Sequence, residues 1–318
     1  EDADVAVVPS GMAAIAAVLL PLLHPGDRAL LPADGYGPTR ALAAEHLTPR
    51  GVHVDLVATQ GLAHADLSGY DLVLVETPSN PGLRVADLAD VAARAHANGR
   101  RDGAGALVVV DNTLLTPLGQ RPLELGADVV VASDTKAVNG HTDALGGHVA
   151  SRDPQVMARV RGWRTLAGGI LGTHEAWLIH RGLETLEVRF ARMCASALAF
   201  AELATGHPAV RAVAYPGLPD HPGHELAQRQ MRGFGGMVSL RLSGGAAAAR
   251  RVAESTRLFQ LAESLGGIES LMNYPAEMTH ASVAGTELAV PDDLLRLSVG
   301  IEDAEDLVAD LERALGSL

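Results

Sequence analysis

Lysine is almost absent from this chain of 318 residues. Of its 25 basic side chains, 24 are arginine and one is lysine, Lys136. A coding bias towards arginine accounts for the count, since alanine, glycine, leucine and valine are abundant as well. Arginine replaces lysine wherever a positive charge suffices, but a guanidinium stays protonated in proteins and cannot form a Schiff base. The one remaining lysine is therefore the first candidate for covalent chemistry.

Cysteine and long apolar runs are scarce as well, and the net charge is negative. The single cysteine, Cys194, excludes a disulfide framework and a cysteine-rich zinc site. The formal net charge of -13 argues against a nucleic-acid partner, because such surfaces neutralise phosphates with Lys and Arg. The longest apolar stretch, Met12–Leu23, is too short to cross a bilayer. Since no signal peptide begins at Glu1, we expect a cytoplasmic protein without a membrane partner.

Two common kinds of ligand motif are missing too. No Gly-x-Gly-x-x-Gly follows a strand-like run and no Walker A sequence occurs, so we expect neither a dinucleotide nor a nucleotide cofactor. Two histidine pairs are present, His174 with His180 and His221 with His224, and we expect neither pair to bind a metal.

Short apolar runs alternate with helix-type segments through the first half of the chain. This alternation predicts an α/β fold with a mainly parallel sheet, built from right-handed crossovers. We predict strands buried on both faces at Arg28–Pro32, Val52–Val57, Leu72–Val75, Leu107–Val110 and Val129–Ala132. Helices are predicted at Ala13–Leu23, Thr39–Thr48, Val85–Asn98 and Leu118–Leu125.

The second half of the chain is predicted to form a smaller α/β unit. A long helical pattern runs from about Thr173 to about Leu203 and leads into it. Strands are expected near Val210–Tyr215, Gly236–Leu242 and Leu294–Val299, with a final amphipathic helix at Ala304–Leu315. We therefore place a large domain at residues 1–185 and a C-terminal domain at 186–318.

Polar side chains follow three consecutive predicted strands at the point where each strand ends. Asn80 comes after the strand that starts at Leu72, Asp111 directly follows the next strand, and Lys136 comes after the third. Ligands of open α/β sheets gather outside the carboxyl ends of the strands. The pattern predicts that Asn80, Asp111 and Lys136 lie along one edge of the sheet.

Lys136 and Asp111 suit a carbonyl cofactor, of which pyridoxal 5′-phosphate (PLP) is the common one. A lysine that forms a Schiff base needs a lowered pKa and a fixed position. The ring nitrogen of PLP needs a carboxylate to keep it protonated, and Asp111 lies one strand–helix–strand unit before Lys136. The alternative is that Asp111 only caps a helix at its strand end.

A phosphate group would need backbone N–H donors at a helix N-terminus. Ser10, Gly11 and Met12 precede an alanine-rich helix, and glycine lets the backbone approach a ligand closely. Ser133 and Thr135 add hydroxyl donors immediately before the lysine. The alternative for Ser10 and Gly11 is an ordinary helix cap, which is a common signal.

With these residues in this order, the sequence resembles the Cys/Met-metabolism PLP enzymes, the trans-sulfuration family. The matching segments extend over nearly the whole chain: Pro9–Ala14, Tyr36–Gly37, Glu76–Pro81, Val110–Thr113, Ser133–His141, Ala262–Gly267, Met278–Ser282 and Arg296–Gly300. The resemblance implies a PLP-dependent transferase fold of type I and a homotetramer made of two active-site dimers. The family's N-terminal segment, which reaches the neighbouring subunit's phosphate, is missing from this sequence, and a chain without it should bind the cofactor poorly.

The resemblance also implies roles around the cofactor. Lys136 binds it covalently and moves protons, Asp111 pairs with its ring nitrogen, and Tyr36 stacks on the ring and assists proton transfer. The phosphate is expected to be bound by Gly11, Met12, Ser133 and Thr135. The alternative for Tyr36 is a core aromatic residue.

On the substrate side, the resemblance assigns Asn80 and Arg296 to a carboxylate clamp with Ser264 nearby. Arginine suits this role because it grips carboxylates with two parallel hydrogen bonds, although Arg296 could also be a surface residue. Glu263 corresponds to an acid that receives the distal amino group of cystathionine in γ-lyases and γ-synthases. Methionine γ-lyases carry a cysteine after the Tyr-Gly pair, where this chain has Pro38. The alternative for Glu263 is a solvated helix residue.

These roles imply a γ-elimination on L-cystathionine that gives L-cysteine, 2-oxobutyrate and ammonia, as in cystathionine γ-lyases. The γ-replacement of cystathionine γ-synthases, on an activated homoserine ester with cysteine, uses the same residues and is the alternative reaction. A third hypothesis, from another class, is a catalytically silent homologue that acts as a binding or scaffold subunit. The intact Lys136, Asp111, Tyr36 and Arg296 argue against it.

Overall fold

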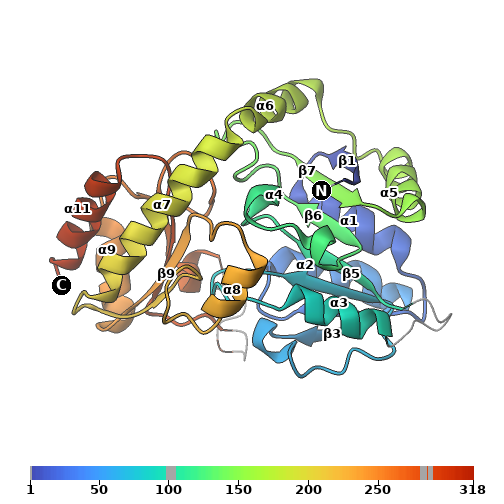
Figure 1. Ribbon diagram of the computed structural model, residues 1–318, viewed down its shortest axis with the longest axis horizontal. Helices are drawn as coiled ribbons and strands as arrows, with labels where there is room; N and C mark the ends of the chain where they lie inside the picture. The colour runs from blue at the N-terminus through green and yellow to red at the C-terminus, as the bar shows by residue number, and fades with distance from the viewer. Residues whose placement is uncertain (1, 98–104, 280–284, 286–288) are drawn as a thin grey trace.

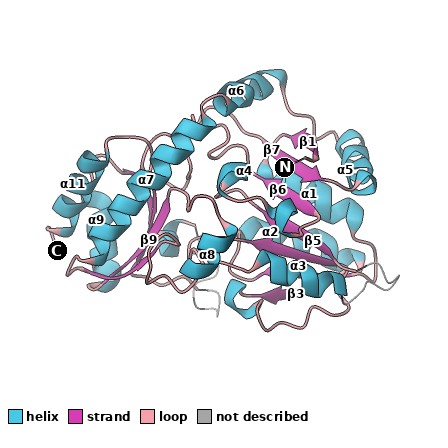
Figure 2. Cartoon of the chain, viewed as in Figure 1, coloured by secondary structure: helices cyan, strands magenta, loops and turns pink. Residues whose placement is uncertain are grey.

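The chain builds two β-sheets with helices packed outside them (Figure 1 and Figure 2). The computed structural model describes residues 2–97, 105–279, 285 and 289–318. A seven-stranded sheet comes from the first half of the chain, and a five-stranded sheet comes from the second. Two predicted segments extend past the described residues: the helix predicted to end at Asn98 and the motif that continues through residues 280–282.

The seven-stranded sheet contains every strand predicted for the first half. These are β2 (Arg28–Pro32), β3 (His53–Val57), β4 (Leu72–Glu76), β5 (Leu107–Asp111) and β6 (Val129–Ala132). Neighbours among them pair in parallel, in the order β6-β5-β4-β2-β3, so the predicted parallel sheet is confirmed. Their carboxyl ends therefore meet at one edge.

Two further strands of this sheet were not predicted. β7 (Gly147–Ser151) pairs with β6 in an antiparallel arrangement, and β1 (Asp4–Val8) pairs with β7 in the same way at the edge of the sheet. β1 has exposed valines, and β7 contains glycine, histidine and serine, so neither is the continuous apolar run that indicates a strand buried on both faces. The sheet is consequently mixed at this end.

Helices cover both faces of the seven-stranded sheet. α1 (Gly11–Leu22) and α5 (Pro154–Ala167) pack on one face, and α3 (Leu88–Ala97) packs on the other. Side chains of β5 alternate between the two cores, with Val109 on the α1 side and Val110 on the α3 side. The shorter elements are α2 (Gly37–Leu42), a π-helical turn (Ala43–Leu47), α4 (Thr116–Gly119) and 3-10 turns at Thr48–Arg50, Thr59–Gly61 and Pro122–Leu125.

Two predicted helices are divided in the structure. The segment Leu118–Leu125 consists of the end of α4 and a separate 3-10 turn, because Pro122 has no N–H to continue the helix. The long helix predicted from Thr173 is interrupted after Leu183, so that α6 (Thr173–Leu183) and α7 (Leu186–Thr205) are separate helices.

The five-stranded sheet has the order β10-β11-β12-β9-β8. β8 (Val210–Ala214), β9 (Met237–Leu242) and β12 (Leu294–Ser298) were predicted, whereas the short β10 (Gln260–Leu261) and β11 (Leu271–Asn273) were not. The helices of this half are α8 (His224–Gln230), α9 (Gly245–Ser255), α10 (Pro275–Met278) and α11 (Ala304–Leu315). Buried residues of α7, α9 and α11 share one core with this sheet.

The start of α7 lies at the predicted domain boundary between residues 185 and 186, which stays a prediction. In the described part of the chain, every helix is too short or too polar to cross a bilayer.

Candidate active site

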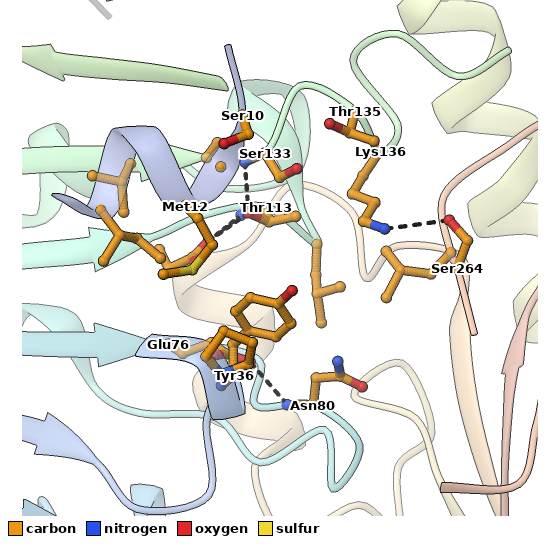
Figure 3. Close-up of a pocket in the computed structure, with 18 of the residues that line it drawn as sticks. Ser10, Met12, Tyr36, Glu76, Asn80, Thr113, Ser133, Thr135, Lys136 and Ser264 are labelled. Atoms are coloured by element: carbon orange, nitrogen blue, oxygen red, sulfur yellow. Dashed lines mark hydrogen bonds between the residues drawn. The ribbon is translucent and has the colours of Figure 1, made fainter. Parts of the chain in front are cut away.

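A cavity of about 450 Å³ opens at the carboxyl ends of β4, β5 and β6. Its other wall comes from the second half of the chain. The eleven residues nominated from the sequence all line it: Gly11, Met12, Tyr36, Asn80, Asp111, Ser133, Thr135, Lys136, Glu263, Ser264 and Arg296. The fold thus brings all of them to one place (Figure 3), although their individual roles stay predictions.

Lys136 lies in the turn that follows β6, and its amine points across the cavity (Figure 3). Its Nζ donates a hydrogen bond to Ser264 Oγ at 3.2 Å. Burial, and then the charge of Arg296, lower the pKa of Lys136. A lysine with a lowered pKa has a larger neutral fraction, and the neutral amine is the nucleophile.

The turn that carries Lys136 is held from α7 by Arg189, which the sequence analysis did not find. Arg189 is buried and donates to the carbonyl oxygens of Ala137 at 2.7 Å and Val138 at 3.2 Å. At Gly140 a Cβ would overlap the guanidinium, and the φ of 74° also favours glycine. The rigid fork of arginine donors therefore ties the residues after the lysine to α7.

Asp111 ends β5 and lines the same cavity. Its Oδ1 accepts hydrogen bonds from Thr113 N at 3.0 Å and Thr113 Oγ1 at 2.5 Å. Burial raises the pKa of Asp111, although these bonds and the charge of His148 act in the opposite direction. A buried carboxyl group of this kind gains from a cationic partner, such as a protonated ring nitrogen.

The N-terminus of α1 faces the turn that precedes Lys136. Ser10 caps α1 by accepting a hydrogen bond from Ala13 N at 3.0 Å. A Cβ at Gly11 would lie 2.6 Å from the Cβ of Ser133, so only glycine permits this approach. The hydroxyl of Thr135 is bonded to the backbone of Gly146 at the edge of the same region. Helix N–H groups and hydroxyls together form a cradle suited to a phosphate.

Arg296, on β12, forms the opposite end of the cavity with Asn80. Its side chain is 3% exposed, and Nη1 donates to Asn80 Oδ1 at 3.1 Å while Nη2 donates to the carbonyl oxygens of Glu263 (2.7 Å) and Ser264 (3.1 Å). Among the residues that the structure describes, the Nε has no hydrogen-bond partner. Burial lowers the pKa of Arg296 to about 10, so it stays charged at neutral pH. A buried cation bonded to neutral oxygens is suited to receive a carboxylate.

Two further residues complete the described part of the site. Tyr36 is 46% exposed and its ring projects into the cavity (Figure 3). Glu76, the last residue of β4, also lines the cavity, and the sequence analysis did not assign it a role. The sequence contained a signal for Glu76, because a carboxylate rarely ends a buried strand. Only the structure shows which groups this carboxylate contacts.

The cavity fits PLP. Its volume accommodates a small aromatic cofactor, one wall has a lysine amine of lowered pKa, and another has a buried carboxyl group. Gly11 and Ser133 approach each other this closely only because position 11 has no Cβ. Among the described residues, no group of three or more His, Cys, Asp or Glu could hold a metal ion. The fold and this site define a PLP-dependent enzyme of fold type I.

More narrowly, the chain belongs to the family described as Cys/Met metabolism PLP-dependent enzymes, whose sequence profile matches residues 1–316. It is 47% identical over 310 residues to cystathionine gamma-synthase of Mycobacterium tuberculosis, covering 96% of this chain and 78% of that protein. A putative cystathionine gamma-lyase of Streptomyces coelicolor is also 47% identical, covering 97% of this chain and 75% of the relative. A solved methionine gamma lyase of Micromonospora echinospora superposes with a TM-score of 0.88 at 42% identity, over 98% of this chain and 81% of the other.

The comparisons confirm the expected family, fold class and PLP cofactor. The similar proteins carry the names of a synthase and of two lyases, so the chain is an enzyme of this trans-sulfuration group. The synthase and the putative cystathionine gamma-lyase are both 47% identical to the chain, so identity does not choose between these two reactions.

Proposed function

We propose that the chain catalyses γ-elimination on L-cystathionine, with uptake of one water and release of L-cysteine, 2-oxobutyrate and ammonia. One observation carries the proposal: a single cavity combines the amine of Lys136, the buried guanidinium of Arg296 and the carboxylate of Glu263. A substrate with a carboxylate at one end and an amino group at the other matches this arrangement of charges.

Substrate binding begins at Arg296 and Asn80. Within the described part of the chain, the guanidinium bonds neutral oxygens only, so an α-carboxylate would replace these contacts with a charge-assisted pair. The side chain of Glu263 is exposed at the cavity wall, and its charge reaches Arg296. In this proposal, Glu263 receives the distal amino group and thereby favours cystathionine over substrates that lack it.

Proton transfer falls to Lys136 and Tyr36. When bound, PLP supplies an electron sink for the negative charge that develops at the substrate's α-carbon. Asp111 would hold the cofactor's ring nitrogen, and the free amine of Lys136 would take the proton from the substrate's α-carbon. Burial, with the charges of Asp111 and Glu76, raises the pKa of Tyr36, so its hydroxyl stays protonated and can donate to the departing sulfur.

A γ-replacement that joins cysteine to an activated homoserine ester is the second candidate function. The 47% identity to a protein named cystathionine gamma-synthase supports it, as the equal identity to a putative cystathionine gamma-lyase supports the first candidate. Lys136, Asp111 and Arg296 would act in the same way. The leaving group at the γ-carbon would be the acid of the ester instead of a thiol, and the thiol of cysteine would then add in place of water.

Product analysis decides between the two reactions. Purified holoenzyme is incubated with L-cystathionine, and separately with an activated homoserine ester plus L-cysteine, and the products are separated by mass spectrometry. The proposal predicts 2-oxobutyrate and cysteine from cystathionine at a rate well above that of cystathionine synthesis. Synthesis as the faster reaction would establish the alternative, and no product in either arm would favour the catalytically silent homologue.

A homotetramer is part of the same proposal. Large apolar side chains are exposed on α5, α6 and α7 and on the loop between α5 and α6: Leu166 (89%), Ile170 (61%), Trp177 (60%) and Val188 (67%). Exposed apolar groups of this size favour burial against another subunit. Light scattering should give four times the chain mass of 33.0 kDa.

The cytoplasmic location stays a prediction that fractionation of cells can test.

A further inference from the structure

We propose that Glu76 is a positioning residue whose carboxylate holds the backbone of Tyr36 and the backbone of Asn80 in a fixed relative position. Tyr36, which stacks on the cofactor ring, and Asn80, which binds the substrate carboxylate, then keep their geometry together. The inference rests on the proposed function, because Tyr36 and Asn80 receive their roles there. It goes further by assigning a role to Glu76, whose side chain bonds both segments but is neither the Schiff-base lysine nor a ligand of the substrate carboxylate.

The two oxygens of Glu76 bond two different segments. Oε2 accepts a hydrogen bond from Tyr36 N at 2.7 Å, and Oε1 accepts one from Asn80 N at 3.2 Å (Figure 3 shows the latter). Tyr36 precedes α2, whereas Asn80 lies in the loop after β4. Glu76 itself is 8% exposed and ends a strand, so it is the rigid member of the three. Bonds from N–H groups to a charged acceptor are about twice as strong as neutral ones.

The arrangement continues to the other side of the cavity. Asn80 Oδ1 accepts a hydrogen bond from Arg296 Nη1 at 3.1 Å, so the contacts run from Tyr36 through Glu76 and Asn80 to β12. A displacement of the Glu76 carboxylate would therefore move the Asn80 backbone relative to the Arg296 guanidinium. This affects the binding of a substrate carboxylate before it affects the covalent chemistry at Lys136.

Gly35 makes room for the carboxylate. A Cβ at this position would lie 2.8 Å from Glu76 Oε2 and 2.7 Å from Pro32 Cγ. The missing side chain lets the segment before Tyr36 close over the end of β4. Gly35→Ala therefore displaces the same carboxylate from the opposite side without changing its chemistry.

Charged groups on every neighbouring element affect the ionisation of Glu76. Asp111 pairs with it in register on β5, Asp34 lies in the loop after β2, and Arg40 lies on α2. Burial, and then the charge of Asp111, raise the pKa of Glu76 to about 8 in the absence of a cofactor. A protonated carboxyl group accepts well at only one oxygen, so protonation weakens one of the two bonds. A cation beside Asp111 would favour the charged form of Glu76, and the charged carboxylate accepts both hydrogen bonds, from Tyr36 N and from Asn80 N.

The test compares wild-type and Glu76→Gln holoenzymes with glycine as the probe. Glycine has the α-carboxylate and amine but no γ-carbon, so the change in cofactor absorbance reports its Kd without any elimination reaction. We expect about tenfold weaker glycine binding in the Gln variant at pH 8.5, since loss of one charge-assisted bond costs about 1.5 kcal/mol or more. The difference should shrink once the pH falls below the pKa that Glu76 has in the holoenzyme, because the wild-type carboxyl group then becomes neutral as well. Borohydride trapping at Lys136 should be unchanged.

Two further variants sharpen the test. Gly35→Ala should weaken glycine binding in the same direction and serves if the Gln variant does not fold. Glu124→Gln, on the exposed 3-10 turn, is the control and should match wild type. Equal glycine affinity in wild type and Glu76→Gln at pH 8.5 would overturn the inference, as would a loss of the same size at every pH. Because glycine binding does not require γ-elimination, these outcomes are independent of whether the proposed reaction is correct.

Discussion

At the scale of single residues, the chemistry of the site depends on groups whose ionisation the cavity has changed. Burial lowers the pKa of Lys136 and Arg296 and raises that of Asp111. All three shifts have the same physical cause, since a charge loses its hydration in a low-dielectric interior. Arg296 nevertheless stays charged near neutral pH, because its pKa remains at about 10.

Lys136→Arg should keep a positive charge at the site and abolish covalent cofactor binding. A guanidinium does not deprotonate, so no amine remains to form the bond. We expect activity to fall by at least about a thousandfold, the scale of a lost general base together with the covalent step. Borohydride treatment followed by peptide mass mapping checks the result. A lysine adduct is impossible in this variant, so a trapped cofactor would have to be on another group and would contradict the assignment.

The stability of the cofactor-free protein should decrease as the pH rises from about 5 to about 8. The pKa of Glu76 is about 8 in the folded chain and near 4.5 when unfolded, so the folded state binds the proton more tightly. The stabilisation is complete below the unfolded pKa and is lost as the pH rises through the folded one. Denaturant unfolding at several pH values measures this slope, which should be flatter in Glu76→Gln. Glu124→Gln should keep the wild-type slope, and parallel slopes in all three proteins would contradict the shift.

At the scale of elements, the site forms where α1 meets the turn after β6. Gly11 allows Ser133 to contact the start of the helix, and Gly147 on β7 does the same for the backbone of Ser10. The unpredicted antiparallel strand β7 therefore supports the phosphate cradle from behind. The position of the helix N-terminus depends on these close approaches as much as on its capping residue.

Gly11→Ala should weaken cofactor binding by about tenfold. The new Cβ would lie 2.6 Å from Ser133 Cβ, and relief of such overpacking costs about 1–3 kcal/mol, part of which opens the cradle. Fluorescence titration with PLP measures the Kd.

The matched control for this change is Gly162→Ala at an exposed position of α5, where an added Cβ meets nothing within 4 Å. It should leave the Kd unchanged and stabilise the helix by about 0.5–1 kcal/mol. If the two alanine variants bind PLP equally well, the cradle does not depend on Gly11.

At the scale of the whole molecule, the cavity needs both halves of the chain. A buried chain of amides joins them behind the site: Gln230 on α8 donates to Gln120 Oε1 at 2.9 Å, and Gln120 donates to Asn112 Oδ1 and to the carbonyl oxygen of Thr77, both at 3.1 Å. Asn112 follows Asp111, and Thr77 follows Glu76. The second half of the chain therefore contacts the strand ends that carry the two buried carboxylates.

Gln230→Leu should lower the free energy of unfolding by about 3 kcal/mol. The Gln230 side chain accepts a hydrogen bond from Leu88 N and donates to Ala86 O and Gln120 Oε1, and the change removes all three bonds. These three buried groups then lose this partner, which costs free energy of folding. Guanidinium unfolding measures the effect. Gln155→Leu on the exposed start of α5 is the control and should change stability by less than about 0.5 kcal/mol. Equal midpoints for the two variants would show that the amide chain contributes no stability.

The sequence predicted much of the fold because its signals are local. Apolar runs indicated the central strands β4, β5 and β6, and the end of each run indicated where Asp111 and Lys136 would lie. β1 was missed because its valines are partly exposed, and β7 was missed because glycine, histidine and serine interrupt its apolar run. The break between α6 and α7 was missed because the helical periodicity continues through Glu184 and Thr185.

By itself, the sequence determined the residue types of the chemistry: one lysine, an aspartate at a strand end and a glycine before a helix. The tertiary structure alone decided which of these groups meet. Lys136 bonds Ser264 across 128 positions, and Arg296 bonds Asn80 across 216. The roles of Glu76 and Arg189 also depend on distant partners. Periodicity and capping act over a few residues, whereas pairing between distant segments depends on how the two sheets pack, and no local pattern records that packing.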